Sequence, residues 1–315
     1  MCEAGETDVM KGDWRVSRVS ARSGNPSWAI AVFAHNEAGR IRAALESIAG
    51  ATGGTDVDVF VLANGCADAT ADEVFACATT IPNLWLVKIE LADKANAWNL
   101  YVHDIIPPER ARELETCFFM DGDVILESDA LLLLASALNE FPSAKAAGAM
   151  PATGRDRDAW RQRMVTYGML AGCLYALRGS FVQRLRERNV RMPVGLIGED
   201  FLVSWLVASE IGSNQDLAGD AHCVFHTGAQ FSFRSLSVWR WRDYRTYLRR
   251  KWRYACRALQ HQMLVLHLAQ NGLQAMPQDV KELYRKAPLP SRLSWVGRDT
   301  PLRFLAVLWI RTFRQ

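Results

Sequence analysis

Apolar runs recur along the first half of the chain, and each is followed by a polar segment and a stretch with helical spacing. The clearest runs are residues 28–34, 57–63, 84–89 and 117–120. Continuous apolar runs are typical of strands buried on both faces. Strands that alternate with helices form βαβ units and a parallel sheet. The pattern therefore predicts an α/β fold with a mostly parallel sheet flanked by helices.

The last of these runs leads directly into Asp121-Gly122-Asp123. This position is the carboxyl end of a predicted buried strand, the edge at which open α/β sheets bind ligands. Two carboxylates so close together repel each other unless a cation lies between them. Mg²⁺ takes carboxylate oxygens together with substrate phosphates. The stretch predicts a metal–diphosphate site, and a solvated Asp-Gly turn is an equally simple alternative at this point.

Two earlier strands also end in polar tips. His35-Asn36-Glu37 follows the first strand and Asn64-Gly65 follows the second. From spacing alone, helix capping explains the first tip better than ligand binding does. Lys94 stands in the first turn of a predicted helix, where its charge opposes the helix dipole. An anion near that end would explain it, and a solvated lysine is the plainer alternative.

A second acidic pair, Glu199-Asp200, follows a glycine-containing approach and opens a predicted helix. Negative charge is favourable at a helix start. Capping alone accounts for one carboxylate more easily than for two. Further on, His222 and His226 stand four residues apart in a predicted strand and therefore share a face. A lone histidine in such a strand is usually structural.

The chain divides into three parts by composition. Residues 1–26 lack periodicity and are expected to be a mostly unstructured lead-in. Residues 27–235 form the α/β region, and residues 236–315 form a helical region rich in basic and aromatic residues. Arginines and aromatics interleave in Trp239–Arg257, and arginines flank an apolar run in Pro301–Arg314. These features suit a membrane interface, a single-stranded nucleic acid, or a solvated basic helix with its aromatics packed inward.

Composition limits the class of protein. Half of the 315 residues are hydrophobic and 23% are charged, as in ordinary globular proteins. The seven cysteines are scattered and form no C-x-x-C pair, which argues against a zinc site or a disulfide framework. The first residues are polar and acidic, unlike a secretory signal, and no apolar stretch is long enough to span a bilayer. We therefore expect a cytoplasmic protein, with peripheral contact to the cytoplasmic face of the membrane.

Taken together, the motifs resemble those of the family-2 glycosyltransferases of the GT-A fold, over roughly residues 28–250. The strand and tip of residues 31–37 resemble the family's opening strand with its N-E pair. Residues 64–70 resemble its D-G-S-x-D-x-T turn, and residues 94–99 its G-K-x-x-A-x-N segment. Asp121-Gly122-Asp123 matches its D-x-D motif, and Glu199-Asp200 matches its E-D pair.

The resemblance implies an inverting, metal-dependent transfer of a sugar from a UDP- or GDP-sugar to a hydroxyl acceptor, such as a lipid-linked or polysaccharide precursor. It implies that Asp200 is the general base and that Glu199 positions the loop or the acceptor. Lys94 and Arg178 are cationic side chains that could help to hold the donor. The implied ligands of Mg²⁺ or Mn²⁺ are Asp121, Asp123 and His226. The implied nucleotide-sugar contacts are Ala34, His35, Asn36, Glu37, Asn64, Lys94, Asp121 and Gly122.

The sequence departs from the family pattern in three places. No carboxylate stands at Ala63 or Asn64 to contact the base, which leaves Asn64 to pair with a base edge and leaves uridine specificity open. Asp93 replaces the glycine before the lysine. The Q-x-x-R-W motif of processive synthases is missing, which favours transfer of a single sugar.

Two other functions were weighed against transfer. A sugar-phosphate nucleotidyltransferase would carry a glycine-rich, basic loop where residues 35–40 stand, so it ranks lower. An alternative of a different class is nucleic-acid binding by Trp239–Arg257, which suits a membrane interface equally well.

Overall fold

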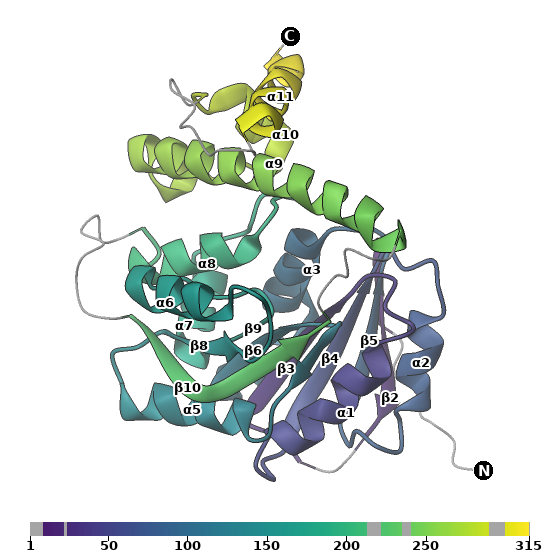
Figure 1. Cartoon of the computed structure of the whole chain (residues 1–315). Helices are drawn as coiled ribbons and strands as arrows, with labels where there is room; N and C mark the ends of the chain where they lie inside the picture. Colours follow the sequence, from purple (N-terminus) through teal and green to yellow (C-terminus); the bar gives the residue numbers. More distant parts are fainter. Residues whose placement is uncertain (1–8, 22–23, 213–221, 235–240, 290–299, 315) are drawn as a thin grey trace.

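The computed structural model describes residues 9–21, 24–212, 222–234, 241–289 and 300–314. Its centre is one sheet of ten strands in the order β1-β2-β5-β4-β3-β6-β9-β8-β10-β7 (Figure 1). The strands are β1 (Val9–Lys11), β2 (Trp14–Ser20), β3 (Trp28–Ala34), β4 (Val57–Asn64), β5 (Leu84–Ile89), β6 (Thr116–Asp121), β7 (Val124–Leu126), β8 (Ala146–Pro151), β9 (Leu174–Arg178) and β10 (Cys223–Phe233).

The sheet is mixed. The central strands β5, β4, β3 and β6 are parallel to one another, whereas β9 runs antiparallel to both β6 and β8. The four apolar runs of the sequence supply this parallel block. In its register Phe33 pairs with Asp121, and Ala34 pairs with Ala63. The carboxyl ends of β3, β4 and β6 therefore meet at one edge, as predicted.

Helices cover both faces of the sheet (Figure 1). The α-helices are α1 (Ile41–Ala51), α2 (Thr70–Ala76), α3 (Lys94–Leu100), α4 (Pro108–Glu113), α5 (Ala130–Glu140), α6 (Arg157–Tyr167), α7 (Gly179–Glu187), α8 (Glu199–Ala208), α9 (Trp241–Asn271), α10 (Val280–Lys286) and α11 (Thr300–Arg311). A π-helical turn, Tyr101–Ile105, continues α3, and short 3-10 turns lie at Leu273–Ala275 and Thr312–Arg314.

Strand β3 shows how the two faces are filled. Ile30 and Val32 belong to a core shared with α1 and α5, whereas Ala31 and Phe33 belong to the core on the opposite face, shared with α3, α7 and α8. Successive side chains of a strand point to opposite faces, so a run with no polar residue fills both cores at once. The α/β fold predicted from these runs is confirmed.

The N-terminal segment differs from the prediction. The lead-in of residues 1–26 was expected to be mostly unstructured, and this is wrong for residues 9–20. Strands β1 and β2 pair there as antiparallel neighbours, and β2 also pairs with β5 from Trp14 opposite Ile89 to Ser20 opposite Leu84. The buried side chains Trp14 and Val16 hold β2 against the core. Their spacing of two was the signal in the sequence.

The C-terminal region is helical, as predicted. Helix α9 runs for 31 residues, and α10 and α11 pack beside it (Figure 1). Trp252 of α9 meets Trp309 of α11 with ring centroids 6.0 Å apart. Leu259 and Ile310 belong to the same core as Phe33. The boundary near residue 235 stays a prediction. None of the helices that the structure describes is long and apolar enough to cross a bilayer.

Candidate active site

A pocket of about 270 Å³ lies at the edge where β3, β4 and β6 end. Eight of the residues predicted for the site line it, together with Asp93 and Arg253. The eight are His35, Glu37, Asn64, Lys94, Asp121, Gly122, Asp123 and Glu199. The structure thus brings together polar tips that lie as far apart in the sequence as His35 and Glu199.

The loop of residues 35–37 and the turn of residues 64–70 are hydrogen-bonded to each other at this edge. His35 Nδ1 lies 2.7 Å from the backbone oxygen of Asn64, and Asn36 Oδ1 accepts a hydrogen bond from the Ala67 amide. The Glu37 amide donates to Thr70 Oγ1 at 2.8 Å. Asn36 has φ of 57°, a left-handed conformation that asparagine tolerates better than most residues. The loop of residues 35–37 is therefore fixed before any ligand binds.

Some predicted contacts have structural roles instead. The Asn64 side chain is 4% exposed and donates to the carbonyls of Ala34 and Leu62, so its amide is engaged within the fold. The prediction that Asn64 reads a base edge therefore lacks a free donor. Ala34 is fully buried, and its carbonyl accepts from Asn64 Nδ2 and Cys66 Sγ, so the structure does not expose it to a ligand. The Gly122 amide donates to the Phe33 carbonyl at 2.8 Å.

Gly122 allows a close approach between the acidic turn and strand β3. A Cβ at this position would lie 2.9 Å from the Phe33 carbonyl oxygen. The glycine therefore lets the acidic turn pack against the neighbouring strand. This holds Asp121 and Asp123 on either side of a tightly anchored residue.

Lys94 is the central cation of the pocket. Its Nζ lies 2.5 Å from Asp121 Oδ1 and 2.5 Å from Glu199 Oε1, and it donates to the Gly172 carbonyl at 3.1 Å. Burial disfavours its charge, but the two carboxylates outweigh this and raise the pKa of Lys94 well above its ordinary value. The lysine at a helix start is thus explained by anions, and these are carboxylates of the protein.

Asp93, which replaces the family's glycine, caps helix α3. Its Oδ1 accepts from the Asn96 amide at 2.7 Å, and its Oδ2 accepts from the Gly195 amide at 3.0 Å. The departure from the family pattern therefore has a local reason: Asp93 joins the start of α3 to the loop before Glu199.

Crowding of carboxylates shifts their pKa values upward. Burial raises the pKa of Asp121 to about 6, and the nearby Glu199 adds to this, whereas Lys94 opposes it. Burial and the charge of Asp123 raise the pKa of Glu37 to about 7, although Arg40 opposes this shift. Such a cluster favours a cation that can neutralise several carboxylates.

Asp121 and Asp123 fit a hard divalent cation that takes two carboxylates and completes its shell with substrate phosphates and water. Within the residues that the structure describes, no group of three or more His, Cys, Asp and Glu could hold a metal alone. Arg40 lies 3.4 Å from Asp123 Oδ2 and 2.6 Å from Glu37 Oε2, a cation that the sequence reasoning missed. Its place three residues after Glu37, on the same turn, was the available signal.

His226 is not brought to this pocket. It lies seven residues before Phe233 on β10, and Phe233 pairs with Val124 beside the acidic turn. Seven residues of strand span about 20 Å. The His226 ring instead accepts from the Gly228 amide at 3.1 Å. Arg178 is also elsewhere: it pairs in register with Thr116, where β6 begins, and donates to the Ala144 carbonyl.

Glu199 and Asp200 open helix α8 and are 5% and 8% exposed. Asp200 Oδ2 accepts from the Gly172 amide at 3.1 Å, and its Oδ1 accepts from Arg257 Nη2 at 2.9 Å. Both side chains lie against Gly172: a Cβ at Gly172 would lie 2.9 Å from Glu199 Oε1 and 3.5 Å from the Asp200 Cβ. The pairing with Arg257, from helix α9, was missed because nothing in the sequence says which face of a basic helix turns inward.

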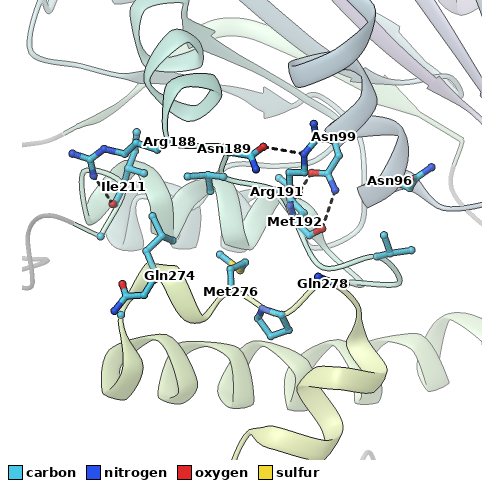
Figure 2. A pocket seen from close by; sticks show the side chains of 16 residues that line it. Asn96, Asn99, Arg188, Asn189, Arg191, Met192, Ile211, Gln274, Met276 and Gln278 are labelled. Atoms are coloured by element: carbon cyan, nitrogen blue, oxygen red, sulfur yellow. Dashed lines mark hydrogen bonds between the residues drawn. The ribbon is translucent and has the colours of Figure 1, made fainter. Parts of the chain in front are cut away.

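A larger cavity, of about 800 Å³, lies between the segment after α7 and the turn after α9 (Figure 2). Three of its polar side chains are engaged within the fold. Arg191 pairs with Asp104, Arg188 donates to the Ile211 carbonyl, and Asn99 exchanges hydrogen bonds with the Met192 backbone. No predicted site residue lines it. The smaller acidic pocket is therefore the candidate active site.

No family model and no curated protein matches the chain in sequence. Solved structures do match it. A mannosyltransferase from Pyrobaculum calidifontis, in complex with GDP-Man and Mn²⁺, is 17% identical, with 93% of this chain and 77% of that chain covered and a TM-score of 0.57. S. aureus TarS 1-349, in complex with UDP-GlcNAc, is 14% identical, with 91% and 81% covered and a TM-score of 0.51. The chain therefore has the fold of the GT-A glycosyltransferases, as its motifs predicted.

Proposed function

We propose that the chain is an inverting, metal-dependent glycosyltransferase that moves one sugar from a nucleoside-diphosphate sugar to a hydroxyl acceptor. The observation that carries the proposal is the position of Lys94. Its ammonium group joins Asp121, on the metal side of the pocket, to Glu199, beside the candidate base. Groups that can hold a diphosphate thus line one cavity, and Asp200, which does not itself line it, follows the lining residue Glu199 in the chain.

Each residue has a role in this reaction. Asp121 and Asp123 would hold Mg²⁺ or Mn²⁺, which when bound neutralises charge on the departing diphosphate. Lys94 orients the same diphosphate. Asp200 takes the proton of the acceptor hydroxyl as the acceptor oxygen bonds to the anomeric carbon. The bond from that carbon to the diphosphate oxygen breaks, and the nucleoside diphosphate leaves with the electron pair. One base and one displacement give inversion.

We propose that the donor nucleotide binds along the same edge of the sheet. The fixed tips His35–Glu37 and the start of α3 border the pocket, which suits a nucleotide laid across the carboxyl ends of the strands. The two matched structures hold GDP-Man and UDP-GlcNAc, and we propose a GDP- or UDP-sugar here. No carboxylate stands at Ala63 or Asn64 to contact a base, so the base is left open between guanine and uracil.

A donor screen tests the proposal. Thermal unfolding is measured with Mn²⁺ and each common nucleotide sugar, together with release of nucleoside diphosphate. We expect one donor to raise the unfolding temperature in a Mn²⁺-dependent manner and to be consumed. Equal protection by every nucleotide sugar with and without Mn²⁺ would contradict the proposal. Pyrophosphate formation from a sugar phosphate and a nucleoside triphosphate would point to the nucleotidyltransferase alternative.

We further propose that the acceptor is lipid-linked and is met at an anionic membrane surface. On α11, Phe304, Leu305, Leu308 and Trp309 are all at least 41% exposed, whereas Ala306 and Ile310 pack inward. No Asp or Glu occurs between Thr300 and Gln315. An apolar helix face with arginines at its ends suits an interface rich in anionic lipid, where each nearby arginine adds roughly 1 kcal/mol of attraction.

The nucleic-acid alternative has less support. Trp252 packs edge to face against Trp309 of α11, and Arg257 is bonded to Asp200. These two residues of the Trp239–Arg257 segment have partners within the protein, so their side chains are not available to stack on bases.

A further inference from the structure

Helix α9 delivers two arginines to the candidate active site, one turn apart. Arg253 lines the acidic pocket, and Arg257 bonds Asp200 immediately behind it. The guanidinium of Arg257 crosses directly over Gly198, where a Cβ would lie 2.3 Å from Nε. Gly198 also has φ of +83°, which disfavours any other residue. The loop before Glu199 is therefore shaped to admit this arginine.

The contact constrains the candidate base. Asp200 Oδ1 accepts from Arg257 Nη2 and from the Phe201 amide, at 2.9 and 3.0 Å, and Oδ2 accepts from the Gly172 amide. Oδ1 therefore already accepts two hydrogen bonds, and it is open to an acceptor hydroxyl only when Arg257 is drawn to another anion.

Charge pairing in the pocket singles out Arg253. Lys94 is paired with Asp121 and Glu199, and Arg40 is paired with Glu37 and Asp123. For Arg253, which is exposed, the described part of the chain provides no hydrogen-bonded or ion-paired carboxylate. A guanidinium that lines a pocket with its donors turned to solvent is suited to an anion brought by a ligand.

We propose that Arg253 and Arg257 form a subsite for a phosphate or carboxylate group of the acceptor, next to the hydroxyl that receives the sugar. This inference rests on the proposed transferase function. Asp200 must touch the accepting hydroxyl, so Arg257, bonded to Asp200 Oδ1, lies beside the groups that flank that hydroxyl. An acceptor anion that binds both guanidinium groups draws Arg257 away and leaves Asp200 free to take the proton.

The donor diphosphate is the other possible source of the anion. Lys94 and the Asp121–Asp123 turn serve the diphosphate in the proposed reaction, whereas the bonded partner of Arg257 is the base. The subsite therefore belongs to the acceptor side of the pocket. The two sources separate experimentally, because the donor's nucleoside diphosphate binds with Mn²⁺ and an acceptor-like anion binds without it.

The test uses the full chain and inorganic phosphate as the probe, with a chelator present and no donor. Isothermal titration compares wild type with Arg253→Gln and Arg257→Gln. The control is Arg311→Gln, which removes the same charge from an exposed position on α11, outside the pocket. We expect wild type and the control to bind phosphate alike and both pocket variants to bind it about tenfold or more weakly. Arg257→Lys keeps the charge and should retain part of the affinity.

Several results would overturn the subsite. They are no phosphate binding by wild type, equal binding by all variants, a matching loss in Arg311→Gln, or a loss confined to one of the two pocket variants. Arg253 is exposed, so Arg253→Gln reports on the site even if Arg257→Gln unfolds. A second titration with Mn²⁺ and GDP or UDP should give the two pocket variants near-normal affinity. A tenfold loss there would assign the arginines to the donor.

The readouts also separate this inference from the transferase proposal. Phosphate binding needs neither donor nor turnover, so it can succeed where the donor screen fails, and the reverse holds too. Once a donor is known, Arg257→Gln should raise the KM for the acceptor while the KM for the donor stays near that of wild type, because the subsite binds the acceptor anion. An unchanged KM for the acceptor would show that Arg257 does not bind the acceptor.

Discussion

Lys94 Nζ lies 2.5 Å from Asp121 Oδ1, across the gap between the start of α3 and the end of β6. This ion pair joins the strand that carries the acidic turn to the helix that follows β5. Lys94 pairs with Oδ1 of Asp121, one of the two carboxylate oxygens. The pair thus serves both the charge balance and the shape of the pocket.

Metal binding should weaken in mild acid. The pKa of Asp121 is raised to about 6, chiefly by burial, and the carboxylate must be ionised to hold a cation. Protonation therefore competes with the metal as the pH falls through about 6. We expect the Kd for Mn²⁺, measured with a nucleoside diphosphate present, to rise from pH 7.5 to pH 5.5. A Kd that stays constant over this range would contradict the assignment of Asp121 as a ligand.

Asp123→Asn should abolish metal-dependent donor binding and leave the fold intact. Asp123 is partly exposed, and its contact with Arg40 is 3.4 Å long, so the change removes charge with little loss of packing. The measurement is Mn²⁺-dependent thermal protection by the donor. Asp129→Asn is the matched control, because Asp129 is exposed and has φ of 60°, which asparagine accepts. Full transfer by Asp123→Asn with excess chelator would exclude a metal role for this turn.

Asp200→Asn should lower turnover by about 10²–10⁴-fold, the usual contribution of a positioned base. Donor and metal affinity should stay near those of wild type, because the Asp121–Asp123 turn is untouched. Turnover and donor binding are measured separately, and NMR gives the anomeric configuration of the product. If donor binding falls as far as in Asp123→Asn, then Asp200 belongs to the metal site. A product with retained configuration would exclude single displacement.

Binding to anionic vesicles should depend on the exposed face of α11. Phe304→Ser with Leu308→Ser removes two side chains that are 54% and 41% exposed, so folding should be unaffected. We expect a loss of vesicle affinity of about tenfold or more at low salt. Val165→Ser with Tyr167→Ser on α6 is the control, since these side chains are 56% and 70% exposed. No binding by wild type, or an equal loss in the control, would remove the membrane from the proposal.

The sequence predicted the centre of the fold well because that centre is encoded locally. Continuous apolar runs such as Trp28–Ala34 can only be strands buried on both faces, and parallel strands bring their carboxyl ends to one edge. Asp121 and Lys94 follow strands of this kind, and their place in one site together with Glu199 was expected from the resemblance to the glycosyltransferases. Their meeting in one pocket agrees with this.

The predictions that the structure does not support, and the contact that the sequence reasoning missed, depend on strand register and on which side of a helix or strand faces inward. His226 shares a strand face with His222, but β10 continues to Phe233, and this later end reaches the acidic turn. Asn64 is polar and stands at the right edge, yet its amide is consumed by the neighbouring backbone. Arg257 lies in a segment where arginines occur on several faces, and only the packing of α9 selects the one that meets Asp200.

The pairing of β2 with β5 has a consequence for solubility. A parallel strand at the margin of a sheet presents a row of unpaired amides and carbonyls that can recruit a strand from another molecule. Strand β2 occupies that row along β5, from Trp14 opposite Ile89 to Ser20 opposite Leu84. Proteolytic removal of residues 1–20 would uncover the margin together with the apolar surface under Trp14 and Val16. The short N-terminal hairpin thus covers the edge of β5 that could otherwise pair with a strand of another molecule, a role that follows from the fold alone.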